Sequence, residues 1–278
     1  MSHGDRRGLR DEDRDDAPIL EFDPAPAAVI EPGEVIEPMS IAPHAVLCFF
    51  QDVIAGVVER HGGRIIDHVV SEIGRNPIYE IDHDGQRLVV MHPGVGAPLA
   101  AGFLEELIAR GCRTFIACGG AGVLVPDVAL GHVIVPTSAV RDEGTSYHYA
   151  PAARTVEPSA QAVEAILATA ERHGVPHVTG ATWTTDALYR ETRDKLDRRV
   201  AEGCLTVEME AAAFFAVAAF RGVTFAQVLY AGDDLSGDAW DERGWDEHTT
   251  GRETLFRIAA EAVLSLPPDP LPVTIEAG

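Results

Sequence analysis

Short, continuous apolar runs recur along the chain and alternate with segments in which apolar residues repeat at helical spacing. Apolar runs without polar alternation are typical of strands that are buried on both faces of a sheet. Such strands are expected at 45–50, 65–70, 78–81, 88–91, 114–118, 132–135, 178–182, 205–207 and 225–231. Helices are expected at 51–61 and 98–110, and around 163–170, 193–202, 211–221 and 255–263. This alternation predicts a mainly parallel or mixed sheet that is covered by helices on both faces.

The first 43 residues differ in composition from the rest of the chain. Residues 1 to about 17 are polar and highly charged, which is typical of disorder. Between 19 and 43, repeated prolines interrupt short apolar pairs, so an extended arm is expected there rather than a helix. This arm would lie on the domain surface or on a neighbouring subunit. The predicted organisation is therefore an acidic, proline-rich and partly disordered arm (1–43), one folded domain (44–266) and a short tail (267–278).

Composition and charge narrow the range of partners and compartments. The formal net charge of −22 argues against nucleic acids and anionic membranes as partners, because both would repel the chain. Its four cysteines are far apart and form no CxxC motif, which is typical of reduced thiols (Cys48, Cys112, Cys118 and Cys204). No apolar stretch reaches the roughly 18 to 20 residues of a membrane span, and the N-terminus lacks the apolar core of a secretory signal. We therefore expect a cytoplasmic protein.

The segment 205–213 carries the most informative chemistry. Its apolar start leads to two carboxylates, Glu208 and Glu210, with Met209 between them, at the start of a predicted helix. Burying a carboxylate beside an apolar run costs several kcal/mol unless hydrogen-bond donors surround it. Sugar hydroxyls are such donors, and a methionine offers an apolar floor for a ribose. The alternative is that the acids only cap the helix by interacting with its positive end.

Three further segments follow predicted strands, at the sheet edge where open α/β sheets bind ligands. Two are glycine-rich, 92–98 and 119–122, and would let a ligand approach backbone N–H groups, although tight turns would also explain these glycines. The third, 230–235, places Asp233 just beyond an apolar strand, in a largely dry setting where it could act as an acid or simply cap a turn. Neither glycine segment matches GxGxxG and no P-loop lysine follows, so a nicotinamide-dependent oxidoreductase is disfavoured.

Two other segments carry weaker signals. The acidic residues between 238 and 248 could bind a divalent cation, but their spacing matches no metal loop, and a solvated flap is the preferred interpretation. No metal site is therefore predicted.

The aromatic and polar segment 141–149 follows a strand and could line a pocket. Because the chain has no Gly-x-Ser-x-Gly motif and no cysteine with a histidine partner in sequence, acyl transfer is disfavoured.

Taken in chain order, these segments resemble the signature of the nucleoside phosphorylase superfamily: uridine and purine nucleoside phosphorylases and methylthioadenosine/S-adenosylhomocysteine nucleosidases. The matching segments are 94–96, 119–122 followed by Pro126 and 131–135, then 143–146, 185–189, 207–211 and 232–233. The resemblance implies a three-layer αβα sandwich around a mixed, partly barrelled sheet, assembled as homodimers or homohexamers. It also implies cleavage of the C1′–N bond of a nucleoside through an oxocarbenium-like transition state, with no cofactor beyond phosphate as a possible co-substrate.

The resemblance also assigns roles to individual residues. Glu210 would hold the ribose 2′ and 3′ hydroxyls, Met209 would pack against the sugar, and Glu208 would lie near the base. Asp233 matches the aspartate with which purine-acting members protonate the leaving base. The substrate site would be completed by Gly96, Gly119, Gly120, Trp183, Leu188 and Tyr189. Thr192 and Asp194 stand near the positions where uracil-acting members carry a glutamine and an arginine, so a purine is favoured.

The phosphate site departs from the superfamily pattern. The turn Gly-Asp-Pro-x-Arg is replaced at 50–54 by Phe-Gln-Asp-Val-Ile, and an arginine and a threonine near the second glycine segment are replaced by Ala117 and Gly120. The candidates for a phosphate or water site are Gln51, Gly94 and, as a residue lent to a neighbouring subunit, Arg75. Each lost charge-assisted contact would weaken phosphate binding by about 1.5–3 kcal/mol. Phosphorolysis is therefore the family default, with hydrolysis by water or a non-catalytic nucleoside-binding module as alternatives.

Overall fold

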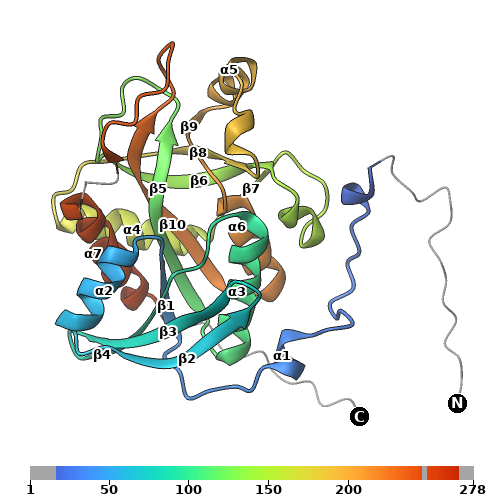
Figure 1. Cartoon of the computed structure of the whole chain (residues 1–278), viewed down its shortest axis with the longest axis vertical. Helices are drawn as coiled ribbons and strands as arrows, with labels where there is room; N and C mark the ends of the chain where they lie inside the picture. The colour runs from blue at the N-terminus through green and yellow to red at the C-terminus, as the bar shows by residue number, and fades with distance from the viewer. Residues whose placement is uncertain (1–16, 246–248, 269–278) are drawn as a thin grey trace, which may run out of the picture.

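The strands form one mixed sheet that is closed into a barrel at one end and open at the other (Figure 1). The computed structural model describes residues 17–245 and 249–268. Within these residues the strand order is β10-β6-β8-β9-β5-β1-β4-β3-β2, with β7 beside β6. Because β10 also pairs with β5, the strands β5, β9, β8, β6 and β10 close into a barrel, and β1, β4, β3 and β2 continue from it as an open sheet. The strands are β1 (His44–Cys48), β2 (Arg64–Ser71), β3 (Gly74–His83), β4 (Gln86–Met91), β5 (Thr114–Val123), β6 (Val133–Asp142), β7 (Thr155–Val156), β8 (His177–Thr185), β9 (Cys204–Glu208) and β10 (Thr224–Asp234).

Helices cover both faces of the sheet, as the alternating pattern predicted (Figure 1). On one face, α3 (Ala97–Arg110) packs against α6 (Ala211–Arg221). On the other lie α2 (Gln51–Arg60), α4 (Ala160–Arg172) and α7 (Thr249–Ser265), while α5 (Arg193–Ala201) lies against β9 of the barrel. The short helical segments are α1 (Pro32–Val35) and the 3-10 turns Pro18–Leu20, Thr145–His148 and Leu188–Arg190. The predicted three-layer fold with a partly barrelled sheet is confirmed.

Two apolar layers, one on each side of the sheet, hold the helices against the strands. On one side, the Phe214 ring of α6 stacks on Phe225 of β10 with a centroid distance of 4.8 Å. On the other, α7 buries Leu255, Phe256 and Ala259 and packs against β1, β5 and β10. Burying one large apolar side chain contributes about 1.5–3 kcal/mol, so these layers fix where strand ends and helix starts meet.

The second glycine segment is not the loop that the sequence predicted. β5 continues through Gly119–Gly122 to Val123 and pairs with β10 and β9. These glycines do not adopt a positive φ. Glycine is needed at these positions because neighbouring rings pack closely against the strand. An added Cβ would stand 2.9 Å from the Phe49 ring at Gly119 and 3.0 Å from the Tyr230 ring at Gly120. The first glycine segment is a loop as predicted, with φ of 80° at Gly94 and 94° at Gly96.

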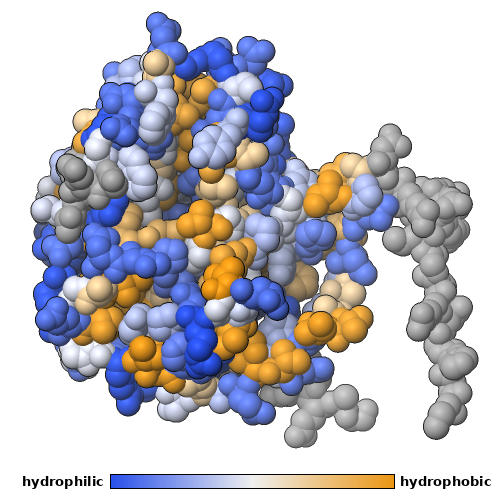
Figure 2. Space-filling view, in the orientation of Figure 1, coloured by the Kyte–Doolittle hydropathy of each residue, from blue (hydrophilic) through white to orange (hydrophobic). Residues whose placement is uncertain are grey.

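The N-terminal arm contacts its own domain and contains helical turns where no helix was expected. α1 begins with a proline at its first position, where the missing N–H is not needed, so the prolines do not exclude a short helix. Glu31 pairs with Arg221 of α6 at 3.2 Å. Val29 and Ile30 stay exposed, and Figure 2 shows apolar surface along the arm. Residues 1–16 and most of the tail predicted at 267–278 lie outside the described residues.

None of the helices in the described ranges combines the length and apolar character needed to cross a bilayer.

Candidate active site

One large cavity, of about 1090 Å³, lies where the ends of β5, β9 and β10 meet the start of α2. Most of the predicted site residues line it: Gln51, Gly120, Leu188, Tyr189, Glu208, Met209, Glu210 and Asp233. The barrel brings these residues together from segments that are far apart in the sequence. Pockets for small ligands span about 300–1,000 Å³, so the cavity can hold a ligand of nucleoside size.

Glu208 is the carboxylate that caps α6. Its oxygens accept hydrogen bonds from the Thr184 hydroxyl (2.6 Å) and from the backbone N–H groups of Glu210 (2.7 Å) and Ala211 (2.6 Å). Burial raises its pKa to about 7, although these three donors favour the charged form. Both oxygens are therefore engaged within the protein, and Glu208 holds the start of α6 in place.

Glu210 is the carboxyl group of this segment that remains available to a ligand in the cavity. It is 5% exposed, and its Oε1 accepts a hydrogen bond from the backbone N–H of Gly96 at 2.6 Å. Within the described residues it makes no ion pair. Burial, and after it the charge of Glu208, raise the pKa of Glu210 to about 8. The capping alternative thus applies to Glu208, while Glu210 is left with capacity to bind a ligand.

Asp233 lies near the end of β10, next to a register irregularity between Ala231 and Asp234. Such irregularities re-aim a side chain away from the strand pattern. Its Oδ2 accepts a hydrogen bond from the Trp240 indole N–H at 2.7 Å. The side chain is only half-buried, so the largely dry setting expected from sequence is wrong: the strand is buried, but the cavity opens beside its end.

Glu191 is a second acid at this end of the cavity and was not predicted from sequence. It follows the turn Leu188–Arg190 and lines the cavity together with Tyr189. Burial, and after it the negative charge of Asp233, raise the pKa of Glu191 to about 7. A glutamate in a polar turn carries no sequence signal that would distinguish it from a solvated residue.

Five of the predicted residues do not line the cavity. Gly96 stands behind Glu210 as its donor, Gly94 packs against Leu99, and Gly119 packs against Phe49. Trp183 is fully buried behind the wall, where its indole N–H donates to Asp142 at 3.0 Å. Arg75 lies on the β2–β3 hairpin beside His68, so its role toward a neighbouring subunit stays a prediction.

Polar residues from α7 and β10 line the cavity next to Phe50 and Asp52, and sequence reasoning missed them. Arg252 of α7 stands one turn before Leu255 and Phe256, on the buried stripe of the helix. Gln227 interrupts the apolar strand β10. A charge on an apolar helix stripe and an amide inside an apolar strand are signals that could have found both residues.

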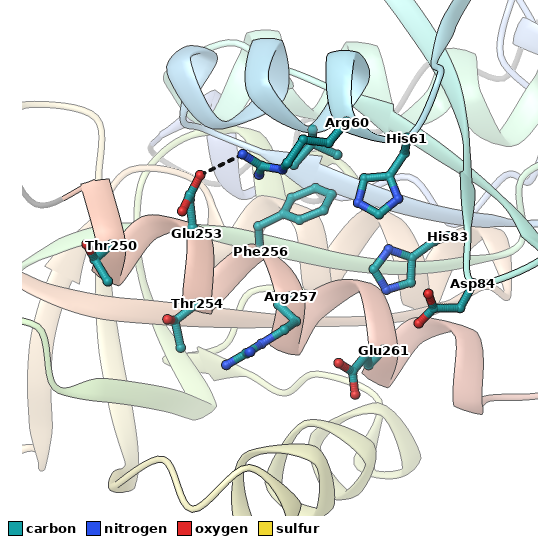
Figure 3. Close-up of a pocket in the computed structure, with 11 residues that line it drawn as sticks. Arg60, His61, His83, Asp84, Thr250, Glu253, Thr254, Phe256, Arg257 and Glu261 are labelled. Carbon is teal, nitrogen blue, oxygen red and sulfur yellow. Dashed lines mark hydrogen bonds and ion pairs between the residues drawn. The ribbon is translucent and has the colours of Figure 1, made fainter.

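A second cavity, of about 480 Å³, lies between the end of α2, the β3–β4 turn and α7 (Figure 3). His61 and His83 face it with ring centroids 5.2 Å apart, and Arg60 pairs with Glu253 at 2.9 Å. None of the predicted site residues lines this cavity.

In the described ranges, no group of three or more histidines, cysteines or acids is placed to hold a metal ion. The acidic segment after β10 is partly held by backbone pairing between Asp234 and Asp241 and by an ion pair of Asp234 with Arg243. Asp246, Glu247 and His248, which belong to the weakly supported cation site, lie outside the described residues.

Comparison with known proteins identifies the family. Residues 43–265 match the model described as the phosphorylase superfamily, and the chain therefore belongs to this superfamily. It is 33% identical over 154 residues to a guanosine phosphorylase from Halorubrum lacusprofundi, covering 54% of this chain and 64% of that protein. It is 34% identical over 185 residues to a uridine phosphorylase from Treponema pallidum, covering 63% of this chain and 71% of that protein.

A solved structure supports the same fold. The uridine phosphorylase from Vibrio fischeri ES114 matches with a TM-score of 0.70 at 24% identity, over 82% of this chain and 93% of that chain. The aligned region spans less than two thirds of the guanosine phosphorylase, at 64% of its length. The superfamily membership expected from sequence is confirmed. Relatives are named for purine and for pyrimidine nucleosides, so membership alone selects no base.

Proposed function

We propose that this chain binds a nucleoside in the large cavity and cleaves its N-glycosidic bond, with phosphate as the acceptor. The observation that carries this proposal is that Glu210 and Met209, which follow β9, line one cavity with Asp233 of β10. Glu210 is buried, has a backbone donor in Gly96, and has no ion pair among the described residues. Sugar hydroxyls are suited to complete its hydrogen bonds.

In the proposed reaction, an oxygen of phosphate forms a bond to C1′ while the C1′–N bond breaks. The electron pair of the breaking bond passes to the base, and Asp233 donates a proton to a ring nitrogen so that the base leaves as a neutral molecule. The products are the free base and ribose 1-phosphate. Glu210 accepts hydrogen bonds from the sugar hydroxyls, and these donors favour its ionised form. The resulting negative charge stabilises the positive character that the sugar gains in the transition state.

A purine is the favoured base in this proposal. Asp233 and Glu191 supply carboxyl groups at one end of the cavity, and purine nitrogens can accept a proton there. By the resemblance, Thr192 and Asp194 fall near the positions of the uracil-reading glutamine and arginine, with Arg193 between them. Arg193 does not substitute for the arginine, because it donates to the backbone carbonyls of Leu235 (3.0 Å) and Gly237 (2.6 Å).

Hydrolysis by water is the second candidate. It is supported by the turn at 50–54, where bulky apolar residues stand in place of glycine and arginine, and by the Tyr230 ring, which packs against Gly120. The reaction chemistry at C1′ would be the same, but the product would be free ribose.

The test is incubation of the purified protein with purine and pyrimidine nucleosides, each with and without phosphate, followed by chromatography. Phosphate-dependent release of base together with ribose 1-phosphate is the expected result. Release of free ribose without phosphate would favour hydrolysis. A nucleoside-induced rise in melting temperature without any base release would favour the non-catalytic binding module.

A further inference from the structure

We call the end of the cavity next to Phe50 and Asp52 the acceptor end, after the proposed phosphate. Two buried polar side chains there have atoms without partners in the part of the chain that the structure describes. Arg252 of α7 is 9% exposed, Gln227 of β10 is 1% exposed, and both line the cavity. Among the residues that the structure describes, Nε of Arg252 and Oε1 of Gln227 have no hydrogen-bond partner. Most buried polar atoms in folded proteins have a partner. Other buried atoms of the described chain also lack one, but Arg252 and Gln227 line the cavity, where a bound group can complete them. The two ends of a glutamine amide can exchange, which lets Gln227 present a donor or an acceptor.

Aromatic rings fix the position of the Arg252 guanidinium. Its central carbon lies 5.2 Å from the ring centroid of Phe50 and 5.7 Å from that of Trp245. These are cation–π distances. Nη2 donates to the backbone carbonyl of Trp245 at 3.2 Å, and the Tyr230 hydroxyl donates to the same carbonyl at 2.9 Å. The guanidinium is therefore held in place before any ligand arrives, which favours binding of an oxyanion.

The acid that pairs with Arg252 is a weak competitor. Oδ1 of Asp52 lies 3.5 Å from Nη1 of Arg252, and the Asp52 side chain is 45% exposed while that of Arg252 is 10% exposed. Asp52 can therefore turn towards solvent when an anion takes its place. At the adjacent start of α2 the cap residue is Phe50, whose side chain caps no N–H group, so within the described residues the helix start lacks a side-chain cap.

We propose that Arg252, together with Gln227 and the first turn of α2, forms the phosphate subsite of this chain. The inference rests on the proposed phosphorolysis. Gln227 pairs in register with Ala117, the position where the resemblance places an arginine, and Tyr230 packs at Gly120, where it places a threonine. In the superfamily pattern, the side chains that donate to phosphate come from β5 and from the turn after β1. In this chain we place the corresponding donors on β10 and α7.

The test is steady-state phosphorolysis at varied phosphate and at varied nucleoside for the wild type, Arg252→Gln and Arg252→Lys. Loss of a charge-assisted donor should raise KM for phosphate about 10- to 100-fold in Arg252→Gln and change KM for the nucleoside less than about threefold. Arg252→Lys should give an intermediate KM for phosphate.

The control is Arg257→Gln, which removes the same charge from an exposed position of α7 beside the second cavity (Figure 3) and should leave both KM values unchanged. Equal rises in both KM values, or an unchanged KM for phosphate in Arg252→Gln, would overturn the proposal.

Asp52→Asn gives a test of opposite sign. Removing the competing carboxylate should lower KM for phosphate severalfold. Loss of base release in this variant would identify Asp52 as a base that activates water, and would overturn the proposal.

Two outcomes separate this inference from the proposed function. A wild type that releases base equally well without phosphate overturns both. A phosphate-dependent wild type whose KM does not respond to Arg252 overturns the subsite alone. If Arg252→Gln fails to fold, calorimetric titration of inorganic phosphate into the wild type and Arg252→Lys decides: weaker binding by the lysine variant supports the subsite, and equal binding overturns it.

Discussion

The proposed sugar end and the proposed acceptor end of the cavity are built in different ways. At the sugar end, Glu208, Met209 and Glu210 belong to one continuous segment, and the cap that Glu208 makes on α6 sets the position of Glu210. At the acceptor end, the polar groups come from α2, β10 and α7, and Asp52 and Arg252 are 200 residues apart. A continuous segment keeps its geometry as a unit, whereas a composite site can exchange its members one at a time. This difference accounts for a sugar end that follows the superfamily pattern beside an acceptor end that does not.

The largest effect is expected at the sugar end, from Glu210→Ala. Two hydroxyl contacts at about 1.5–3 kcal/mol each would be lost, so kcat/KM for a riboside should fall about 10³-fold. The loss should be at least about tenfold smaller for the matching 2′-deoxynucleoside, which lacks one of the two hydroxyls. The measurement is kcat/KM on both substrates. Equal losses on both would show that Glu210 does not bind the sugar hydroxyls.

Asp233→Asn should have the next largest effect, because it removes the proposed proton donor to the leaving base. General acid catalysis typically contributes about 10²–10⁴-fold, and we expect a fall in kcat of about 10²-fold on a purine nucleoside. A riboside with a nitrophenol leaving group needs no protonation and should be cleaved at a nearly unchanged rate. Asp234→Asn is the matched control, because Asp234 pairs with Arg243 and does not line the cavity. Near wild-type base release by Asp233→Asn would refute the assignment.

Sequence reasoning reached the layers of the fold and the segment 208–210 that lines the cavity, because both depend on local patterns. The apolar run before Glu208 and the spacing of Glu208, Met209 and Glu210 are visible in one stretch of chain. It failed where the conformation or position of a residue depends on packing between segments that are distant in the sequence. Gly119–Gly122 looked like a loop, because glycines in a strand that exist for close contact with a ring cannot be told from turn glycines. The charge of Arg252 on an apolar helix stripe was a usable signal, but its place beside Phe50 depends on how α7 packs on the barrel, which the sequence does not show.

A smaller effect is expected on the free energy of unfolding when Glu210 is replaced by glutamine. This effect tests how far burial destabilises the charged form of Glu210. The pKa of Glu210 is raised from 4.5 to about 8 in the folded protein. The folded state therefore binds more protons than the unfolded state between these values, and stability falls as pH rises through this window. Glu210→Gln should unfold with a free energy about 1–3 kcal/mol above the wild type at pH 8.5 and close to it at pH 4.5. Urea unfolding at the two pH values is the measurement, and an equal difference at both would contradict the burial argument.

The smallest effect is expected at the acceptor end, from Tyr230→Phe. The Tyr230 hydroxyl donates to the Trp245 carbonyl that also receives a hydrogen bond from Arg252, so its loss should loosen the guanidinium without removing it. One such bond contributes about 0.5–1.5 kcal/mol, and KM for phosphate should rise about two- to tenfold. KM for the nucleoside should stay unchanged, because Glu210 and Met209 keep their positions.

The matched control is Tyr147→Phe, which removes a similar hydroxyl-to-carbonyl bond to Arg141 away from the cavity and should alter neither KM. A Tyr230→Phe variant that weakens nucleoside and phosphate alike would show that the two ends are mechanically one unit, and would remove the basis for treating the acceptor end as free to change by itself.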